Sequence, residues 1–180
     1  MMENFLLVDI DSCVRCYACE IACRQEHDLT FETASRWCKV ATVGPRRIEG
    51  KLHMDFIPLF CLHCEDPLCA TRCPSGAISK SDAGMVLIDE KACSGCRLCI
   101  YDCPYGCMSF NEQKGTAGHC DLCKGRIEAG LEPSCVQHCI GGALQFVTAG
   151  ELAERTSGQH TMRMGKVWYV SAKWKLNPPL

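Results

Sequence analysis

The stretch "CSGCRLCIYDCPYGC" at residues 93–107 places five cysteines within fifteen positions. Its first four cysteines follow the spacing C-x2-C-x2-C-x3-C, and Pro104 comes directly after the fourth. The same spacing recurs at residues 13–23, so the stretch is one copy of a repeated unit. The fifth cysteine, Cys107, lies outside this spacing and needs an explanation of its own.

Sixteen of the 18 cysteines fall into four runs, which we number along the chain. Two cysteines, Cys38 and Cys107, belong to no run. Runs one and three share one spacing, whereas the middle gap has four residues in run two and eleven in run four. Run one is Cys13, Cys16, Cys19 and Cys23; run two is Cys61, Cys64, Cys69 and Cys73; run three is Cys93, Cys96, Cys99 and Cys103; run four is Cys120, Cys123, Cys135 and Cys139.

The composition indicates a metal-binding protein. At 18 cysteines in 180 residues, either disulfides or metal sites are expected. The first residues show no basic segment followed by a long apolar one, so we expect no signal peptide and a reducing, cytoplasmic location, where clustered cysteines bind metal more often than they pair. No apolar run is long enough to span a bilayer. The 19 basic and 21 acidic residues give a net charge of −2, which argues against nucleic-acid binding.

The spacing of runs one and three is that of bacterial ferredoxins, in which three cysteines bind one [4Fe-4S] cluster and the fourth binds a neighbouring cluster. Runs must therefore exchange their last cysteines in pairs. A proline follows the fourth cysteine in runs two and three (Pro74 and Pro104), whereas Arg24 and Ile140 follow it in runs one and four. We therefore expect run two to pair with run three, and run one with run four.

An internal repeat supports this organisation. The lead-in "LVDIDSC" to run one resembles "LIDEKAC" before run three, and three runs end in "CPSGAIS", "CPYGCMS" and "CIGGALQ". In this register Cys107 stands where Ala77 and Ala143 stand, so we predict a small packing residue and not a ligand. Cys38 lies outside every run and is predicted to be a buried, non-ligating thiol.

Short strands are expected around the runs. The segment "AISKS" should pair with "MVLID" through the turn "DAG" as a hairpin. Further strands are expected at residues 4–9, 107–110 and 143–147. Helical turns are expected after the fourth cysteine of every run, because proline suits the first position of a helix.

Two segments are surplus to cluster binding. Residues 36–58 are predicted to form a hairpin, because apolar residues alternate over 52–56 and Gly44-Pro45 can start a turn. Residues 151–180 are predicted to be an extended C-terminal tail that docks onto a partner, because their aromatic residues are of the kind enriched in interfaces. The alternative is that these aromatic residues pack back onto the core.

Other sites fit the pattern less well. Zinc sites use two C-x2-C pairs, whereas runs one and three contain triplets with a fourth cysteine. Disulfides between cysteines two residues apart rarely reach the required geometry. No nucleotide-binding or hydrolase motif is present. His63, His119 and His138 adjoin cysteines of the runs, and we expect them to tune cluster potentials through hydrogen bonds rather than to bind iron.

Three segments carry a resemblance to a known family. "CLHCEDPLCATRCPSGAI", "CSGCRLCIYDCPYG" and "HCDLCKGRIEAGLEPSCVQHCIGGAL" resemble the second, third and fourth motifs of the DMSO-reductase-type electron-transfer subunits, which accompany molybdenum or tungsten enzymes. The resemblance implies an α+β fold with two interlocked bacterial-ferredoxin-like modules, related by pseudo-twofold symmetry, and four [4Fe-4S] clusters. It assigns the ligands of the four clusters as Cys13, Cys16, Cys19 and Cys139; Cys120, Cys123, Cys135 and Cys23; Cys61, Cys64, Cys69 and Cys103; and Cys93, Cys96, Cys99 and Cys73.

The resemblance also suggests a division of the chain. Every run is complete here, although some relatives replace one cysteine by tryptophan, and Ile140 replaces a proline that is frequent after run four. The compact form is similar to the small subunits of soluble tungsten enzymes, such as aldehyde-oxidoreductase-type complexes and benzoyl-CoA reductases. We expect one module from residues 1–35 and 112–150, a hairpin insertion at 36–58, the second module at 59–111 and the docking tail at 151–180.

The function implied by the resemblance is that of a non-catalytic subunit. Such a chain would relay single electrons between a large molybdenum- or tungsten-pterin catalytic subunit and a second redox protein, within a hetero-oligomer. One alternative is a free-standing, soluble polyferredoxin that meets its partners transiently. Another is an iron–sulfur protein of assembly or regulation. Whatever co-purifies with the chain at fixed stoichiometry would distinguish them.

Overall fold

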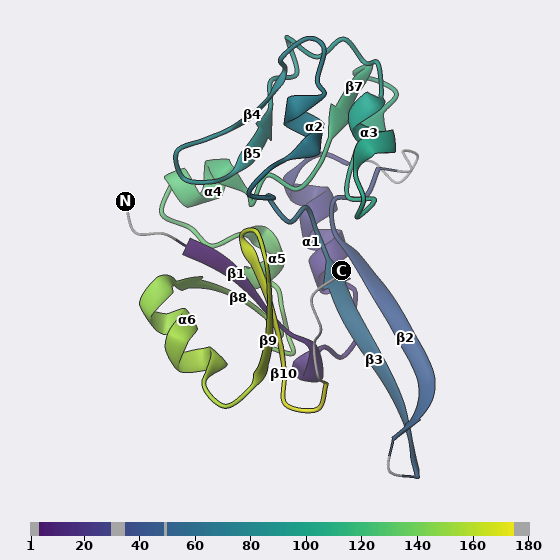
Figure 1. Cartoon of the computed structure of the whole chain (residues 1–180), viewed down its shortest axis with the longest axis vertical. Coiled ribbons are helices and arrows are strands. Elements are labelled where there is room, and N and C mark those ends of the chain that lie inside the picture. Colours follow the sequence, from purple (N-terminus) through teal and green to yellow (C-terminus); the bar gives the residue numbers. More distant parts are fainter. Residues whose placement is uncertain (1–3, 30–34, 49, 175–180) are drawn as a thin grey trace.

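The computed structural model describes residues 4–29, 35–48 and 50–174, in which short strands and helices surround the cysteine runs (Figure 1). No helix within these residues is long and apolar enough to cross a membrane. The elements are β1 (Asn4–Asp9), the 3-10 helix η1 (Ile10–Ser12), α1 (Ala18–Glu26), β2 (Lys39–Ile48), β3 (Lys51–Leu59), α2 (Leu68–Thr71), β4 (Ile78–Lys80), β5 (Val86–Ile88), α3 (Leu98–Asp102), β6 (Ser109–Asn111), β7 (Thr116–Gly118), α4 (Lys124–Glu128), α5 (Ser134–Gln137), β8 (Leu144–Thr148), α6 (Ala149–Thr156), β9 (His160–Met164) and β10 (Val167–Ser171).

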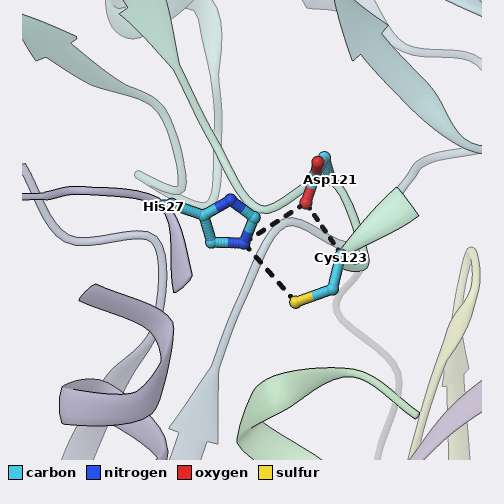
Figure 2. Close-up of side chains that lie close together, drawn as sticks. All are labelled: His27, Asp121 and Cys123. Carbon is cyan, nitrogen blue, oxygen red and sulfur yellow. Dashed lines mark hydrogen bonds and ion pairs between the residues drawn. The ribbon is translucent and has the colours of Figure 1, made fainter. Parts of the chain in front are cut away.

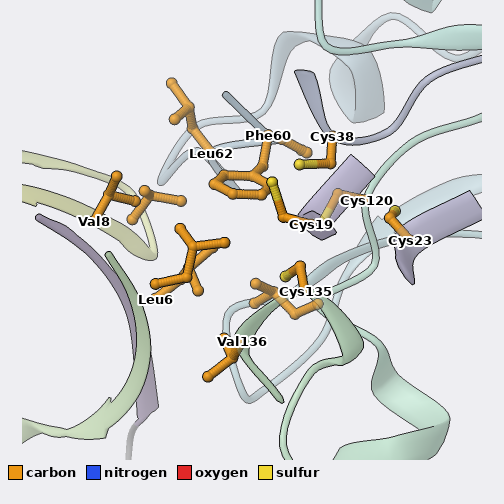
Figure 3. Packing of buried hydrophobic residues seen from close by; sticks show 14 of the residues in the cluster. Leu6, Val8, Cys19, Cys23, Cys38, Phe60, Leu62, Cys120, Cys135 and Val136 are labelled. Atoms are coloured by element: carbon orange, nitrogen blue, oxygen red, sulfur yellow. The ribbon is translucent and has the colours of Figure 1, made fainter. Parts of the chain in front are cut away.

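The largest sheet has the strand order β8-β1-β10-β9. Strand β1 runs parallel to β10 and antiparallel to β8. Successive side chains of a strand point to opposite faces, and both faces of β1 are buried. Leu6 and Val8 face the core that contains cysteines of runs one and four (Figure 3), and Phe5 and Leu7 face a smaller core closed by Leu152 of α6. The sheet therefore packs directly against the cysteine loops.

The prediction of an extended docking tail at residues 151–180 is wrong for the residues that the structure describes. This segment forms most of α6 together with β9 and β10, and β10 lies inside the sheet next to β1. Val167, Tyr169 and Val170 are buried, and the Tyr169 hydroxyl donates a hydrogen bond to the Pro58 carbonyl at 3.2 Å. The apolar strand β1 needs a partner on its second edge, and β10 supplies it. Residues 175–180 lie outside the described part.

The hairpins agree with prediction except at one turn. Strand β4 pairs antiparallel with β5, with Ile78 opposite Ile88, and β2 pairs with β3 in the hairpin that projects from the body in Figure 1. The further pair, β6 with β7, includes one strand that was not predicted. The prediction that Gly44-Pro45 starts a turn is wrong, because these residues occupy a bulge inside β2 where the pairing register shifts. Proline has no N–H to give to a ladder, and a bulge tolerates it.

The predicted helical turns lie elsewhere in three of the four runs. In runs two, three and four a short helix (α2, α3 and α5) precedes the fourth cysteine and a turn follows it, whereas α1 contains Cys23, the fourth cysteine of run one, and continues to Glu26. A residue before proline is disfavoured in the helical region. Cys103, which precedes Pro104, accordingly has an extended conformation with φ −75° and ψ 109°. In runs two and three the proline therefore follows a helix that has already ended and does not start a new one.

Candidate metal centres

The same backbone bend occurs in the C-x2-C loop of all four runs. The residue before the second cysteine has a positive φ in each run: 58° at Arg15, 49° at His63, 70° at Gly95 and 58° at Leu122. A left-handed conformation costs a non-glycine residue roughly 1–2 kcal/mol. Three of these four residues are not glycine, so their backbone is strained in the conformation that bends each loop. Sequence inspection missed the bend, for which Gly95 was the one available signal.

The first set of thiols joins runs one and four. A small cavity is lined by Cys13, Cys16, Cys19 and Cys139, although Cys139 lies far along the chain. Burial, followed by the neighbouring thiols of Cys19, Cys139 and Cys16, raises the pKa of Cys13. The structure therefore brings together the four cysteines predicted for the first cluster.

The second set consists of three cysteines of run four and the last cysteine of run one. Burial, followed by the neighbouring Cys123, raises the pKa of Cys23 to about 12. Burial also raises the pKa of Cys120, with the thiols of Cys23 and Cys135 adding to the effect. Figure 3 shows Cys23, Cys120 and Cys135 gathered in one core.

The third and fourth sets join runs two and three. Burial, followed by the neighbouring thiols of Cys69, Cys64 and Cys103, raises the pKa of Cys61 to about 12. Burial likewise raises the pKa of Cys99 to about 11. The thiols that add to the shift of Cys99 are, in order, those of Cys69, Cys93, Cys96 and Cys73.

These thiols suit iron–sulfur clusters in both number and chemistry. All eighteen cysteines lie in the described part, and none of them forms a disulfide. Buried thiols with raised pKa values resist ionisation when no cation is near, whereas metal binding deprotonates cysteine and supplies the missing positive charge. Four cysteines gather at each position, which is the complete ligand set of a [4Fe-4S] cluster. The donor set therefore fits the predicted cofactor.

The repeat register that explains Cys107 has a structural counterpart. A glycine precedes each of the three equivalent residues Ala77, Cys107 and Ala143. These glycines have a positive φ: 66° at Gly76, 60° at Gly106 and 66° at Gly142. The Cys107 thiol donates a hydrogen bond to the Phe60 carbonyl at 2.8 Å, and its backbone N–H lies 3.5 Å from the Cys103 sulfur. Cys107 thus occupies a position equivalent to two buried alanines, with its own hydrogen-bond acceptor in the protein.

Cys38, the other cysteine outside the runs, is 2% exposed. It lies beside Cys19 in Figure 3, and the hydrogen bond between the two thiols lowers the pKa of Cys19. Cys38 is therefore a buried neighbour of a predicted ligand. Its role as a non-ligand stays a prediction.

The histidines named from the sequence contact backbone atoms. His63 accepts a hydrogen bond from the Val86 N–H at 2.9 Å, and burial lowers its pKa to about 3. Nδ1 of His119 lies 2.6 Å from the Cys120 carbonyl, and Nδ1 of His138 lies 2.8 Å from the Ser134 carbonyl. These backbone contacts hold the three rings beside the cysteine loops.

One histidine without a predicted role does reach a sulfur. Nε2 of His27 lies 3.4 Å from Sγ of Cys123 and 3.5 Å from Oδ1 of Asp121 (Figure 2). His27 follows α1, whereas Cys123 belongs to run four, 96 residues later. Only the fold brings the two together, so the sequence offered no signal for this contact.

Comparison with known proteins identifies the family. The sequence model described as "4Fe-4S dicluster domain" matches residues 52–149. The sequence is 39% identical to the B-chain of the anaerobic dimethyl sulfoxide reductase of Escherichia coli strain K12 over 153 residues, which cover 82% of this protein and 75% of the relative. The chain belongs to the 4Fe-4S dicluster family.

Two further relatives are subunits of other redox enzymes. The B-subunit of the tetrathionate reductase of Salmonella typhimurium strain LT2 is 35% identical, over 77% of this protein and 55% of the relative. The iron–sulfur subunit of the nitrate-inducible formate dehydrogenase of E. coli strain K12 is 34% identical, over 82% and 55% respectively. Family membership confirms the predicted [4Fe-4S] cofactors and the role of a non-catalytic, electron-transferring subunit.

Proposed function

We propose that the chain is built from two ferredoxin-like modules. Run one and run four form the first, because β1 pairs with β8 and α1 packs against α5. Run two and run three form the second, because β4 pairs with β5 and α2 packs against α3. Corresponding hydrogen bonds support the symmetry: the Asp9 N–H donates to the Ala143 carbonyl and the Asp89 N–H to the Ala77 carbonyl, both at 2.8 Å. The C-terminal strands extend the sheet of the first module.

The exchange of last cysteines is the observation that carries the proposal. In each set, three thiols come from one run and the fourth from its partner run. The proposed sets are Cys13, Cys16, Cys19 and Cys139; Cys120, Cys123, Cys135 and Cys23; Cys61, Cys64, Cys69 and Cys103; and Cys93, Cys96, Cys99 and Cys73.

The four sets form a continuous path for electrons. Cys19, in the first set, adds to the pKa shift of Cys135 in the second. Cys61, in the third set, adds to that of Cys120 in the second. Cys69, in the third set, adds to that of Cys99 in the fourth. Interactions of this kind require proximity, so we infer the order first, second, third and fourth, in which each cluster exchanges electrons with its neighbours.

Exposed apolar side chains near both ends of this path support two docking faces. Val14 and Ile140, beside the first set, are 62% and 81% exposed. Leu98 and Tyr101, beside the fourth set, are 44% and 82% exposed. We propose that one face binds a large molybdenum- or tungsten-pterin catalytic subunit and the other a second redox protein. A tungsten-enzyme partner and a cytoplasmic location stay predictions from the sequence.

Purification of the tagged chain from its anaerobically grown host tests this function. We expect about sixteen irons and sixteen sulfides per chain, four of each per cluster, and a larger subunit at constant stoichiometry. Clusters reduced with dithionite should be reoxidised when that subunit's oxidised substrate is added to the complex. A chain that always elutes alone, with its four clusters, would instead indicate a free-standing carrier, and stoichiometric zinc would overturn the cluster assignment.

A further inference from the structure

His27, Asp121 and Cys123 form a compact group beside the second set of thiols (Figure 2). The three side-chain ligand atoms lie within 4.8 Å of one another. Such a grouping could hold an ion, but Cys123 belongs to the proposed second cluster. The question is therefore what His27 and Asp121 do for the sulfur of Cys123.

The surroundings of His27 fix which of its nitrogens carries a proton. Nε2 faces a carboxylate oxygen of Asp121 at 3.5 Å and the sulfur of Cys123 at 3.4 Å. A carboxylate and a cluster-bound thiolate both lack a proton and can only accept. Nε2 must therefore donate, and it does so in the neutral and in the charged form of the ring.

The donor is also held in place. The backbone N–H of His27 donates a hydrogen bond to the Cys23 carbonyl at 3.2 Å, which ties His27 to the end of α1 and to the backbone of another cysteine of the same set. The ring of Trp37 packs on the imidazole with the ring centroids 4.5 Å apart. Asp121 is anchored in turn, because its Oδ1 accepts the N–H of Cys123 at 2.8 Å. The ring therefore has little freedom to turn away from the sulfur.

We propose that His27 raises the reduction potential of the second cluster by donating its Nε2–H to the Cys123 sulfur, and that Asp121 opposes this effect. A hydrogen bond to a ligand sulfur stabilises the more negative, reduced cluster. The Asp121 carboxylate competes for the same proton and adds negative charge, so it favours the oxidised cluster. The inference rests on the ligand sets proposed above. The hydrogen bond would therefore favour the presence of an electron on the second cluster.

The test compares three variants by redox titration followed with electron paramagnetic resonance. At the ambient potential that half-reduces the second cluster of the native chain, His27→Leu should lower its reduced-to-oxidised ratio about tenfold, equivalent to 59 mV for one electron. His27→Gln keeps an N–H donor and should stay within about threefold of the native ratio. His160→Gln, which alters an exposed histidine of β9, is the matched control and should change nothing.

Asp121→Asn supplies a change of opposite sign. Loss of the competing carboxylate should raise the reduced-to-oxidised ratio of the same cluster, while the other three keep theirs. An unchanged ratio in His27→Leu with four intact clusters would overturn the proposal, and so would loss of the cluster in both His27 variants, which would make His27 a structural support. If the native chain does not bind four clusters, the proposed function fails, and that outcome is visible before any variant is made.

Discussion

Single residues in left-handed conformations shape the cysteine loops. Arg15, His63 and Leu122 adopt this conformation despite their side chains, whereas run three uses Gly95. Run three needs glycine here because a neighbouring segment of the same chain lies very close. A Cβ at Gly95 would lie 2.5 Å from the Gly115 carbonyl oxygen. At this position the loop of run three meets the turn between β6 and β7. Glycine is therefore required there by close approach as well as by backbone conformation.

Gly95→Ala and Gly106→Ala separate these two effects. Both glycines have positive φ, but nothing lies within 4 Å of a Cβ at Gly106. Gly106→Ala should cost roughly 1 kcal/mol of unfolding free energy from backbone strain alone, which is about 2–4 °C in a chain of this size. Gly95→Ala should have a larger effect, because overpacking adds about 1–3 kcal/mol to the cost of backbone strain. We expect the temperature at which visible cluster absorbance is lost to fall at least twice as much in Gly95→Ala as in Gly106→Ala. Equal shifts would contradict the close approach.

The two cysteines outside the runs give a second prediction for single residues. Cys107→Ala and Cys38→Ala should each retain the native iron content, because Cys107 occupies an alanine position of the repeat and Cys38 lies outside every set. Cys103→Ala, four residues from Cys107, should lose up to about four irons, since it removes a ligand of the third cluster. Iron and sulfide assays on matched preparations decide the point. A native iron content in Cys103→Ala, with a loss in Cys107→Ala, would show the register to be wrong.

Among the elements, the C-terminal hairpin β9–β10 has the most consequence for the metal centres. Its turn rests on the loop of run two, where the Lys166 N–H donates to the Leu62 carbonyl at 2.9 Å. The Leu6 N–H donates to the Lys166 carbonyl at 3.0 Å, so the same residue joins that loop to β1. The hairpin therefore links the sheet of the first module to a cysteine loop of the second.

Gly165→Ala tests this link. A Cβ at Gly165 would lie 2.3 Å from the Leu62 carbonyl oxygen and 2.5 Å from that of His63. We expect the hairpin to be displaced and the third cluster to be lost faster on exposure to a chelator. Gly158→Ala is the control, because Gly158 also has a positive φ but no atom within 4 Å of its Cβ. If both variants lose iron at the same rate, the turn does not support the loop.

The strands and helices show which parts of the fold the sequence predicts. Strand β1 and the β4–β5 hairpin follow from local patterns, and the residue after each fourth cysteine, proline or not, predicted which runs associate. The positions of β9 and β10 were not predictable in this way, because β10 is buried by pairing with an edge of β1, far away in the sequence, and β9 pairs with β10. The contact of His27 with Cys123 was missed for the same reason. Local spacing specifies ligands, whereas packing between distant segments specifies their surroundings.

The whole molecule is organised by exchange between distant runs. Each proposed set draws one cysteine from another run, so no run can complete a cluster alone. The close approach of run four to run one is visible at Gly141, where a Cβ would lie 2.6 Å from the Ser12 carbonyl oxygen. A substitution near one end of the sequence should therefore alter a cluster whose other three ligands lie near the opposite end.

Cys139→Ala tests the exchange. We expect loss or alteration of the cluster bound by Cys13, Cys16 and Cys19, while the clusters of runs two and three keep their signals. The reason is that Cys139 lines the same cavity as these three cysteines. Electron paramagnetic resonance of the reduced protein, together with iron content, reports which cluster is affected. Loss confined to the cluster gripped by Cys120, Cys123 and Cys135 would refute the exchange.

The parallel pairing of β1 with β10 has a consequence for how the protein is made. Leu6 lies opposite Val167, so the sheet that backs the first two clusters closes only after all four runs have left the ribosome. Domains usually fold as their chain emerges, beginning with the N-terminal part. Here one edge of β1 stays unpaired until β10 has been synthesised. We therefore expect the first module to receive its iron only after β10 has been synthesised.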